Sequence, residues 1–299
     1  MTTNEYLTGV LKQQNLDDES QEMKDLRAHR EDVETLLRNE FRESSPTIRY
    51  GGSRAKGTLI RESYDLDIIC YFPEDESAAG TSLEEIYNNV KKALEREYFV
   101  EPKNSSLRLM NRDAKKPNRD FHIDVVPGRY VDEKRTDCFI HQNNAEKERL
   151  KTNLQAHIDH VRNSGVVDAV RLLKLWKTRR MIGVKQFVWE LLVIDLLKGK
   201  KAWVVEDQLR HVWETIRDTE DPINVEDPAN PSGNDLSEVI SNVWSTLRSQ
   251  AESTINLIDA AGWESVFGSV KRAESASARI AGLSGAASAA TVRSSPWAK

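Results

Sequence analysis

The sequence predicts an α+β protein with two lobes, one built on short strands and one helical, braced by a long N-terminal helix. Runs of β-branched and aromatic residues over 63–72 and 121–127 indicate strands in the first half. Residues 145–270 read mostly as helix and hold six of the seven tryptophans. Residues 16–41 are polar, with apolar residues at helical spacing. The expected regions are a brace over 1–44, a sheet lobe over 45–145, a helical lobe over 146–271 and an Ala/Ser-rich tail over 272–299.

Each element has its own local signal. Residues 16–41 are expected to form one amphipathic helix. Ser82 can cap a second helix over 82–98. Pro127 is expected to end the second strand or to place it at a sheet edge, because proline donates no ladder hydrogen bond. Residues 218–235, rich in Pro, Asn and Asp, indicate a loop between helices. The tryptophans are expected to form the helical core rather than a surface on which bases stack.

The two predicted strands carry three carboxylates. Asp65 and Asp67 lie two residues apart, and side chains at that spacing share one face of a strand. Asp124 lies in the second strand, on the face opposite its apolar neighbours. Three converging carboxylates repel one another unless a cation neutralises them, and all-oxygen ligation suits Mg²⁺ or Mn²⁺. The pattern predicts that Asp65, Asp67 and Asp124 are both metal ligands and catalytic residues.

A turn of small residues precedes the first acidic strand. Gly52 and Ser53 open the run Gly-Ser-Arg-Ala-Lys-Gly-Thr, where backbone N–H groups can approach a phosphate. Each piece has an ordinary reading, because most Gly-Ser pairs are turns and Asp-x-Asp is common at exposed strand ends. The combination of the turn, the carboxylate pair and a third carboxylate in an apolar strand indicates a nucleotidyl-transfer site.

These residues resemble a known superfamily. Gly52-Ser53, Asp65, Asp67 and Asp124 occur in the order seen in the nucleotidyltransferases that include DNA polymerase β. Further segments resemble the CD-NTases, the bacterial cGAS/DncV-like enzymes related to oligoadenylate synthases. Those segments are 52–58, 171–176, 186–192, 227–231 and 263–268. The resemblance spans about residues 45 to 270, and it implies a polymerase β-like lobe with a mixed sheet and helices, followed by a helical C-terminal lobe.

Polar residues outside the acidic strands are candidates for substrate contact. The resemblance implies that Lys174 contacts the donor triphosphate; a surface lysine with a packed stem is the alternative. Lys56 either faces a phosphate or faces solvent. Gln186 resembles a substrate-contacting glutamine of the oligoadenylate synthases, although Lys185 or a structural role fits as well. Glu190 is expected to pair with an arginine inside the helical lobe.

Composition excludes several classes of protein. The chain has 299 residues, 38% hydrophobic and 30% charged, which is ordinary globular material. No apolar run approaches the roughly 20 residues of a membrane helix, and the N-terminus lacks a signal peptide, so a cytoplasmic protein is expected. With only Cys70 and Cys138 there is no disulfide framework. The net charge of −5 argues against tight binding of long nucleic acid. His157 and His160 are interpreted as a solvated helix face rather than a metal pair.

The leading hypothesis is a nucleotidyltransferase of the EC 2.7.7 type. The resemblance implies that it joins nucleoside triphosphates, ATP among them, into a cyclic di- or trinucleotide second messenger for anti-phage defence (CBASS). One alternative is a linear oligoadenylate synthase or a terminal RNA nucleotidyltransferase. Another is a catalytically idle nucleotide-binding regulator. The partners expected are the nucleotides and an accessory regulatory protein at the C-terminal tail, with no membrane and no requirement for long nucleic acid.

Overall fold

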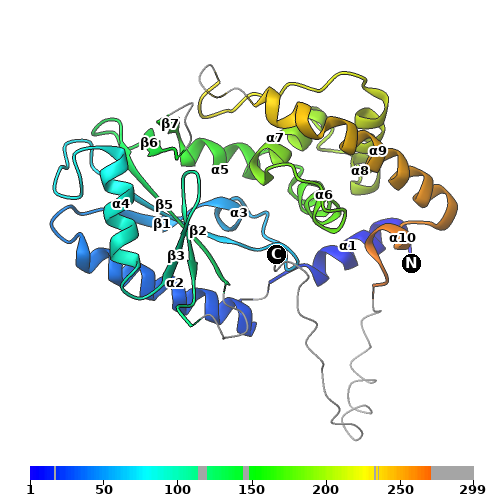
Figure 1. The fold of residues 1–299 in the computed structure, drawn as a ribbon. Coiled ribbons are helices and arrows are strands. Elements are labelled where there is room, and N and C mark those ends of the chain that lie inside the picture. Colours follow the sequence, from blue (N-terminus) through cyan, green and yellow to red (C-terminus); the bar gives the residue numbers. More distant parts are fainter. Residues whose placement is uncertain (17, 114–119, 144–147, 232–233, 235, 271–299) are drawn as a thin grey trace, which may run out of the picture. The chain divides into compact units, whose positions relative to one another are not determined.

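Figure 1 shows the computed structural model of the chain. The described residues are 1–16, 18–113, 120–143, 148–231, 234 and 236–270. Residues 1–268 form one compact unit. The Ala/Ser-rich tail expected over 272–299 lies outside the described residues.

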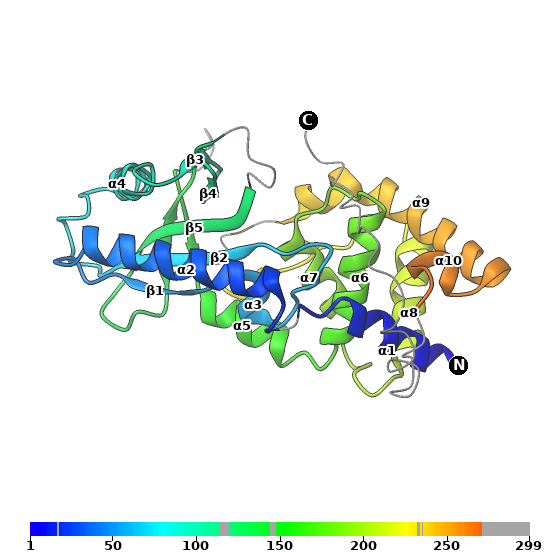
Figure 2. The same cartoon turned by 90° about the horizontal axis from the view of Figure 1, so that it is seen from below.

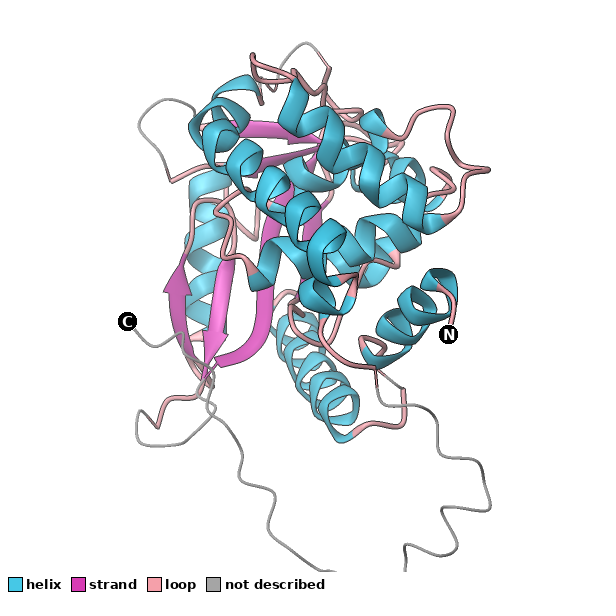
Figure 3. Ribbon diagram, turned by 90° about the vertical axis from the view of Figure 1, so that its right-hand side faces the viewer, coloured by secondary structure: helices cyan, strands magenta, loops and turns pink. Residues whose placement is uncertain are grey.

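The first half of the chain builds a mixed sheet of seven strands among the described residues. The central order is β1-β2-β5-β4-β3, and β6 joins β5 and β7. The strands β2 and β5 pair in parallel, whereas the other neighbours are antiparallel. Figure 3 shows these strands in magenta. The bounds are β1 Thr47–Tyr50, β2 Leu66–Phe72, β3 Phe99–Pro102, β4 Leu107–Met110, β5 Asp120–Tyr130, β6 Cys138–His141 and β7 Arg149–Thr152.

The strand β5 continues through Pro127 and has partner strands on both sides, so the expectation that this proline ends the strand or places it at a sheet edge was wrong. Residues Ile123 to Arg129 of β5 pair with the whole length of β2. On its other edge, β4 pairs only as far as Val125, and β6 begins to pair at Gly128. Pro127 therefore falls in a gap between two partner strands, where a missing N–H disturbs the ladder least.

Helices α2 (Gln21–Glu40) and α4 (Leu83–Leu94) cover one face of the sheet. Figure 2 shows α2 running along the strands. The expected cap of α4 is confirmed, because the Ser82 hydroxyl accepts a hydrogen bond from the Glu85 N–H at 3.1 Å. Alternate residues of β2, among them Leu66 and Ile68, pack into this core, while Ile69 faces a smaller cluster on the opposite side. Asp67 shares the parity of Ile69 and so points away from the main core.

The second half of the chain is helical. Its helices are α5 Leu154–Arg162, α6 Val167–Arg179, α7 Gln186–Leu196, α8 Val205–Asp218, α9 Ser237–Ala261 and α10 Glu264–Phe267. Trp176 lies with its ring centroid 5.8 Å from those of Trp189 and Trp213, and all three side chains are buried. The expected tryptophan core is confirmed for these residues, whereas Trp203 is 45% exposed. None of the helices among the described residues combines the length and apolarity that a membrane span requires.

The N-terminal region contains two helices where the sequence indicated one. The helix α2 covers most of the expected range 16–41, and α1 (Thr3–Gln13) precedes it. The missed signal is a capping box, in which the side chains of Thr2 and Glu5 each accept a hydrogen bond from the other residue's N–H. α1 packs on α6 and α8, while α2 packs on α4 and β5. The brace is therefore divided between the helical half and the sheet.

Candidate active site

The parallel pairing of β2 and β5 brings the predicted carboxylates together. Asp67 and Asp124 face each other in register on these adjacent strands, and Asp65 lies just before β2 begins. Burial, followed by the charges of Asp124 and Asp65, raises the pKa of Asp67 to about 7. A carboxyl group responds in this way when its ionised form is both desolvated and repelled by like charges. The three aspartates thus form one electrostatic cluster, as their spacing in the sequence predicts.

Gly52 lies against the carboxylate of Asp67. It opens the short helix α3 (Gly52–Lys56) with a φ of +49°, and a Cβ at this position would come within 1.5 Å of Asp67 Oδ2. The Gly51 N–H donates to the Asp67 carbonyl at 2.8 Å. Glycine is therefore required for the backbone geometry and for the close approach. Ser53 follows in the same turn and is buried.

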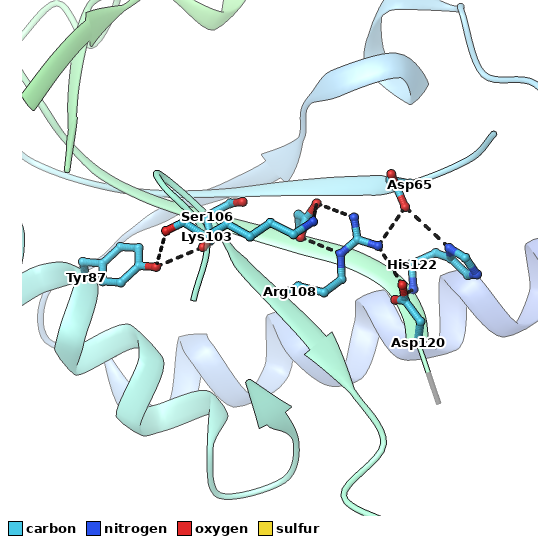
Figure 4. A network of polar contacts seen from close by, with 8 residues as sticks. Asp65, Tyr87, Lys103, Ser106, Arg108, Asp120 and His122 are labelled. Carbon is cyan, nitrogen blue, oxygen red and sulfur yellow. Dashed lines mark hydrogen bonds and ion pairs between the residues drawn. The ribbon is translucent and has the colours of Figure 1, made fainter. Parts of the chain in front are cut away.

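Arg108 is the main partner of the carboxylates, and the sequence did not indicate it. It lies on β4 opposite Asp124, and its Nε and Nη2 donate to Asp124 Oδ1 and Oδ2, both at 2.8 Å. Its Nη1 lies 3.0 Å from Asp65 Oδ1 and 2.9 Å from Asp120 Oδ2 (Figure 4). Burial alone would lower the pKa of Arg108, but these carboxylates raise it. The guanidinium is the principal counter-charge of the cluster.

Asp120 reaches this cluster because β5 is irregular at its start. Four residues along a regular strand span about 13 Å, so Asp120 and Asp124 would ordinarily lie far apart. The register with β4 jumps from Ile123 to Asp120, which leaves two extra residues in β5. One of them, His122, has a φ of +56°, and its N–H donates to Asp120 Oδ1 at 2.7 Å. This bulge places a third carboxylate, that of Asp120, on Arg108.

Two further basic side chains touch the aspartates. Lys103 Nζ lies 3.2 Å from Asp124 Oδ2, and its side chain is 39% exposed. His122 Nδ1 lies 3.5 Å from Asp65 Oδ1, and this hydrogen bond is the main cause of a raised pKa for the histidine. Against the effect of burial, His122 and Arg108 together lower the pKa of Asp65. His122 therefore lies at the edge of the site.

The donor set suits a divalent cation in charge and chemistry. Asp65, Asp67 and Asp124 supply carboxylate oxygens, which Mg²⁺ and Mn²⁺ prefer. Within the described part of the chain, however, no three acidic, histidine or cysteine side chains converge on one point as metal ligands do. Instead the side-chain oxygens of Asp124 and Asp65 are turned to Arg108. Ligation would therefore require these side chains to rearrange around the ion.

A second buried cluster links α3 to the helical half. Glu190 on α7 is fully buried and accepts hydrogen bonds from Lys56 Nζ, from Thr58 Oγ1 at 2.6 Å and from Gln186 Nε2 at 3.3 Å. The expected arginine partner was wrong, because the pairing cation is Lys56 from the strand-forming half. Lys56 and Gln186, both predicted to contact substrate, therefore meet at Glu190, and their contact with a nucleotide stays a prediction.

Lys174 is buried beside this cluster. Only 3% of the residue is exposed, so the alternative of a surface lysine was wrong. Its Nζ lies 3.4 Å from the Thr58 carbonyl oxygen, a long hydrogen bond. Burial lowers the pKa of Lys174 to about 8, even though the charges of Glu190 and Asp65 oppose the shift. An ammonium that is so weakly partnered in a buried place is costly unless an anion joins it.

His157 and His160 behave differently from each other. His160 is exposed, as expected. His157 is not part of a solvated face, because its Nε2 lies 2.7 Å from Oδ1 of the buried Asp227. Asp227 also accepts hydrogen bonds from the Ala229 N–H at 2.9 Å and from Asn234 Nδ2 at 2.7 Å. This network fastens the loop between α8 and α9 to α5, so His157 is structural.

Comparisons with known proteins bear on the domain family and the fold. Residues 34–122 match the nucleotidyltransferase domain family. The matched segment contains Gly52, Ser53, Asp65 and Asp67, and it ends two residues before Asp124. No curated protein sequence matches the chain.

Solved structures share the fold over most of the chain. CdnC from E. coli MS115-1, solved with ATP and also in a complex with HORMA-deltaN, is 20% identical with a TM-score of 0.64 in each case. The ATP structure covers 90% of this chain and 99% of its own. The CD-NTase CdnG from Bradyrhizobium diazoefficiens, solved with GTP, is 13% identical (TM-score 0.67; 88% and 94% covered). The cyclic AMP-GMP synthase DncV from Vibrio cholerae is 14% identical (TM-score 0.57; 90% and 86% covered). The predicted fold class, a nucleotidyltransferase lobe with a helical lobe, is confirmed.

Proposed function

We propose that this protein is a CD-NTase-like nucleotidyltransferase that joins nucleoside triphosphates and releases pyrophosphate. The observation that carries the proposal is the cluster of Asp65, Asp67 and Asp124, with Asp67 and Asp124 in register on β2 and β5. Burial, followed by the charges of Asp124 and Asp65, raises the pKa of Asp67 to about 7, so the cluster favours added positive charge. The match of residues 34–122 to the nucleotidyltransferase domain family supports the reaction class.

The chain's own residues would divide the work as follows. Divalent cations held by Asp65, Asp67 and Asp124, Mg²⁺ or Mn²⁺, would offset the charge of the triphosphate and lower the pKa of the attacking ribose hydroxyl. Asp124 would accept the proton of that hydroxyl. Gly52 and Ser53 would orient the phosphates. Each contribution is greatest in the transition state, where negative charge moves to the leaving pyrophosphate.

Lys174 would supply positive charge to the triphosphate in addition to that of the metal ions. Its ammonium is buried, weakly partnered and within the electrostatic influence of Asp65. Lys56 and Gln186 would assist from the neighbouring cluster around Glu190. A triphosphate carries about four negative charges, so cations beyond the metals are expected near it.

For the product, we propose a cyclic di- or trinucleotide that acts as a second messenger in anti-phage defence (CBASS). The shared fold with DncV, a cyclic AMP-GMP synthase, supports this choice. The structure of CdnC with ATP supports the proposal that ATP is among the substrates. The complex of CdnC with HORMA-deltaN supports an accessory regulatory protein as partner. We propose that such a partner acts on the C-terminal tail, residues 272–299.

The test is incubation of the full chain with all four labelled nucleoside triphosphates and Mg²⁺ or Mn²⁺. We expect release of pyrophosphate and a product that resists phosphatase, with the mass of a cyclic di- or trinucleotide. A phosphatase-sensitive ladder would replace the proposal with a linear oligoadenylate synthase or an RNA-tailing enzyme. Binding of nucleotide without pyrophosphate release would replace it with an idle regulator.

A further inference from the structure

Arg108 holds the side-chain oxygens that a metal ion would use. Both oxygens of Asp124 accept hydrogen bonds from it at 2.8 Å, and Oδ1 of Asp65 lies 3.0 Å from its Nη1. The side chain of Arg108 is only 9% exposed. Its charge is therefore screened less by solvent than that of an exposed side chain, and it repels any second cation placed between the same carboxylates. Arg108 and a divalent ion compete for one pair of aspartates.

We propose that Arg108 is an internal counter-cation that occupies Asp65 and Asp124 before a metal binds and has to release them for ligation. This inference rests on the proposed function, since it assumes that the aspartates are the metal ligands. The role is a positioning one, because Arg108 acts through Asp65 and Asp124. Without Arg108 or a metal, the carboxylates of Asp65, Asp67 and Asp124 would lose their main buried counter-charge and would keep only the weaker contacts of Lys103 and His122.

Asp120 provides the place to which Arg108 can withdraw. Its Oδ2 lies 2.9 Å from Arg108 Nη1, and its Oδ1 is fixed by the N–H of His122 at 2.7 Å. Asp120 is not among the three aspartates predicted to bind metal. A guanidinium that gives up Asp65 and Asp124 thus keeps one charged partner, which lowers the cost of the exchange. The bulge in β5 brings the Asp120 carboxylate to Arg108.

Lys103 offers an internal comparison. It touches the same Asp124 Oδ2, but at 3.2 Å, through one contact and with its side chain 39% exposed. Exposed ion pairs are weakened by solvent and salt, whereas buried bidentate arginine pairs are not. Lys103 should therefore hinder a metal much less than Arg108 does. The order of the two effects tests whether geometry and burial, rather than positive charge alone, control access to the aspartates.

The experiment measures Mn²⁺ binding to the full chain without nucleotide, by titration with detection of free Mn²⁺ by electron paramagnetic resonance. We expect Arg108→Gln to bind Mn²⁺ about tenfold more tightly than the wild type, the size of one competitive coupling between two sites. Lys103→Gln should change the affinity less than about threefold. Asp120→Asn should bind Mn²⁺ more weakly than the wild type, because Arg108 loses its alternative partner.

A matched control is available on β5. Arg129 is also partly buried, but its guanidinium donates to the backbone carbonyls of Glu76, Gly80 and Thr81 rather than to carboxylates. Arg129→Gln should lower thermal stability without changing Mn²⁺ affinity. Thermal unfolding with and without Mn²⁺ gives a second readout, in which the metal should raise the melting temperature of Arg108→Gln more than that of the wild type.

Unchanged or weaker Mn²⁺ binding by Arg108→Gln would overturn the inference, because Arg108 would then be a structural or pre-organising residue. If Arg108→Gln does not fold, Arg108→Lys takes its place, because lysine keeps the charge but loses the bidentate contact. The inference then requires that Arg108→Lys binds Mn²⁺ more tightly than the wild type and that Asp120→Asn binds it more weakly. The outcome is separable from the proposed function. If Arg108→Gln binds Mn²⁺ more tightly but the wild type never incorporates nucleotides, the proposed nucleotidyl transfer is rejected. The inference that Arg108 competes with the metal ion for Asp65 and Asp124 still holds.

Discussion

Two clusters of charge meet at residues 52–58, and they are opposite in sign. The acidic cluster gathers Asp65, Asp67 and Asp124 around the cation of Arg108. The basic cluster gathers Lys56 and Lys174 around the anion of Glu190. The same short segment serves both, because Gly52 lies against Asp67 while Lys56 and Thr58 bond to Glu190.

The clusters differ in how open they are. The side chain of Asp65 is 46% exposed, whereas Glu190 is fully buried and Lys174 is 3% exposed. Arg108 is itself only 9% exposed, but a ligand can reach its partner Asp65 from solvent, whereas a counter-ion whose partner is fully buried mainly holds the structure together. The comparison therefore assigns ligand exchange to Arg108 and a structural role to Glu190. A metal-bound triphosphate would present its cations to the first cluster and its anions to the second.

The largest expected effect is in the acidic cluster. Replacing Asp65 and Asp67 together by Asn should reduce nucleotide incorporation by about a thousandfold or more, because metal-assisted stabilisation contributes several kcal/mol. The fold should persist, since the change removes repulsion and leaves Glu190 and its partners untouched. Pyrophosphate release and circular dichroism measure the two results. Retained incorporation would reject the assignment of the site.

Gly52→Ala separates the close approach at Asp67 from ordinary backbone strain. The new Cβ would meet Asp67 Oδ2 at 1.5 Å, so Asp67 has to move by an ångström or more. Misplacement of that size costs roughly a hundredfold in rate. Gly57→Ala is the control, because Gly57 also has a positive φ, of +77°, but has no neighbouring atom within 4 Å of the Cβ position. It should lose about 1 kcal/mol of stability and keep its incorporation rate within a few-fold. Equal losses of rate in both variants would contradict the contact.

Glu190→Gln tests the closed cluster by its stability. The substitution leaves Lys56 and Lys174 without a buried counter-charge, and we expect the free energy of unfolding to fall by about 3 kcal/mol. Glu62→Gln is the control, since Glu62 pairs with Arg179 at 2.5 Å in a half-exposed place and should cost about 1 kcal/mol or less. Urea unfolding of both variants measures the difference. Similar costs would mean that the Glu190 cluster is not the more structural of the two.

The residues that the sequence identified and those that it missed differ in a physical way. Asp65, Asp67 and Asp124 were predictable because strand periodicity and parallel pairing place them together. Arg108 and Asp120 were missed because they reach the cluster through an antiparallel register and a bulge, which no local pattern in the chain encodes.

The helical half shows the same limit. The tryptophan core was predictable from helical periodicity. So was the loop between α8 and α9, in its described residues 219–231, 234 and 236. The partner of Glu190 was expected within the same half, but it comes from Lys56, more than a hundred residues earlier in the chain. Pairings between distant segments depend on how the two halves meet, and residue spacing carries no record of that contact.

The smallest expected effect comes from substituting Lys174. Most substitutions of buried residues lower the free energy of unfolding, whereas this one should raise it. Because burial lowers the pKa of Lys174 from 10.5 to about 8, the unfolded chain binds more protons than the folded chain between these pH values. Below pH 8 the folded protein therefore carries the full cost of a buried ammonium, and this cost disappears as the pH rises towards 10.5. Lys174→Met should stabilise the protein at pH 7 by about 1–3 kcal/mol, and the gain should shrink across that pH range.

The same variant should raise the KM for nucleoside triphosphate, because the phosphate would lose its buried cation. Urea unfolding of wild type and Lys174→Met at pH 7 and at pH 10, together with steady-state kinetics, measures both effects. Lys177→Met provides the comparison on α6, since burial also lowers the pKa of Lys177, but its Nζ donates to the Val184 carbonyl at 2.9 Å. A gain in stability with an unchanged KM would show that Lys174 does not serve the triphosphate, and the basic cluster would then be structural throughout.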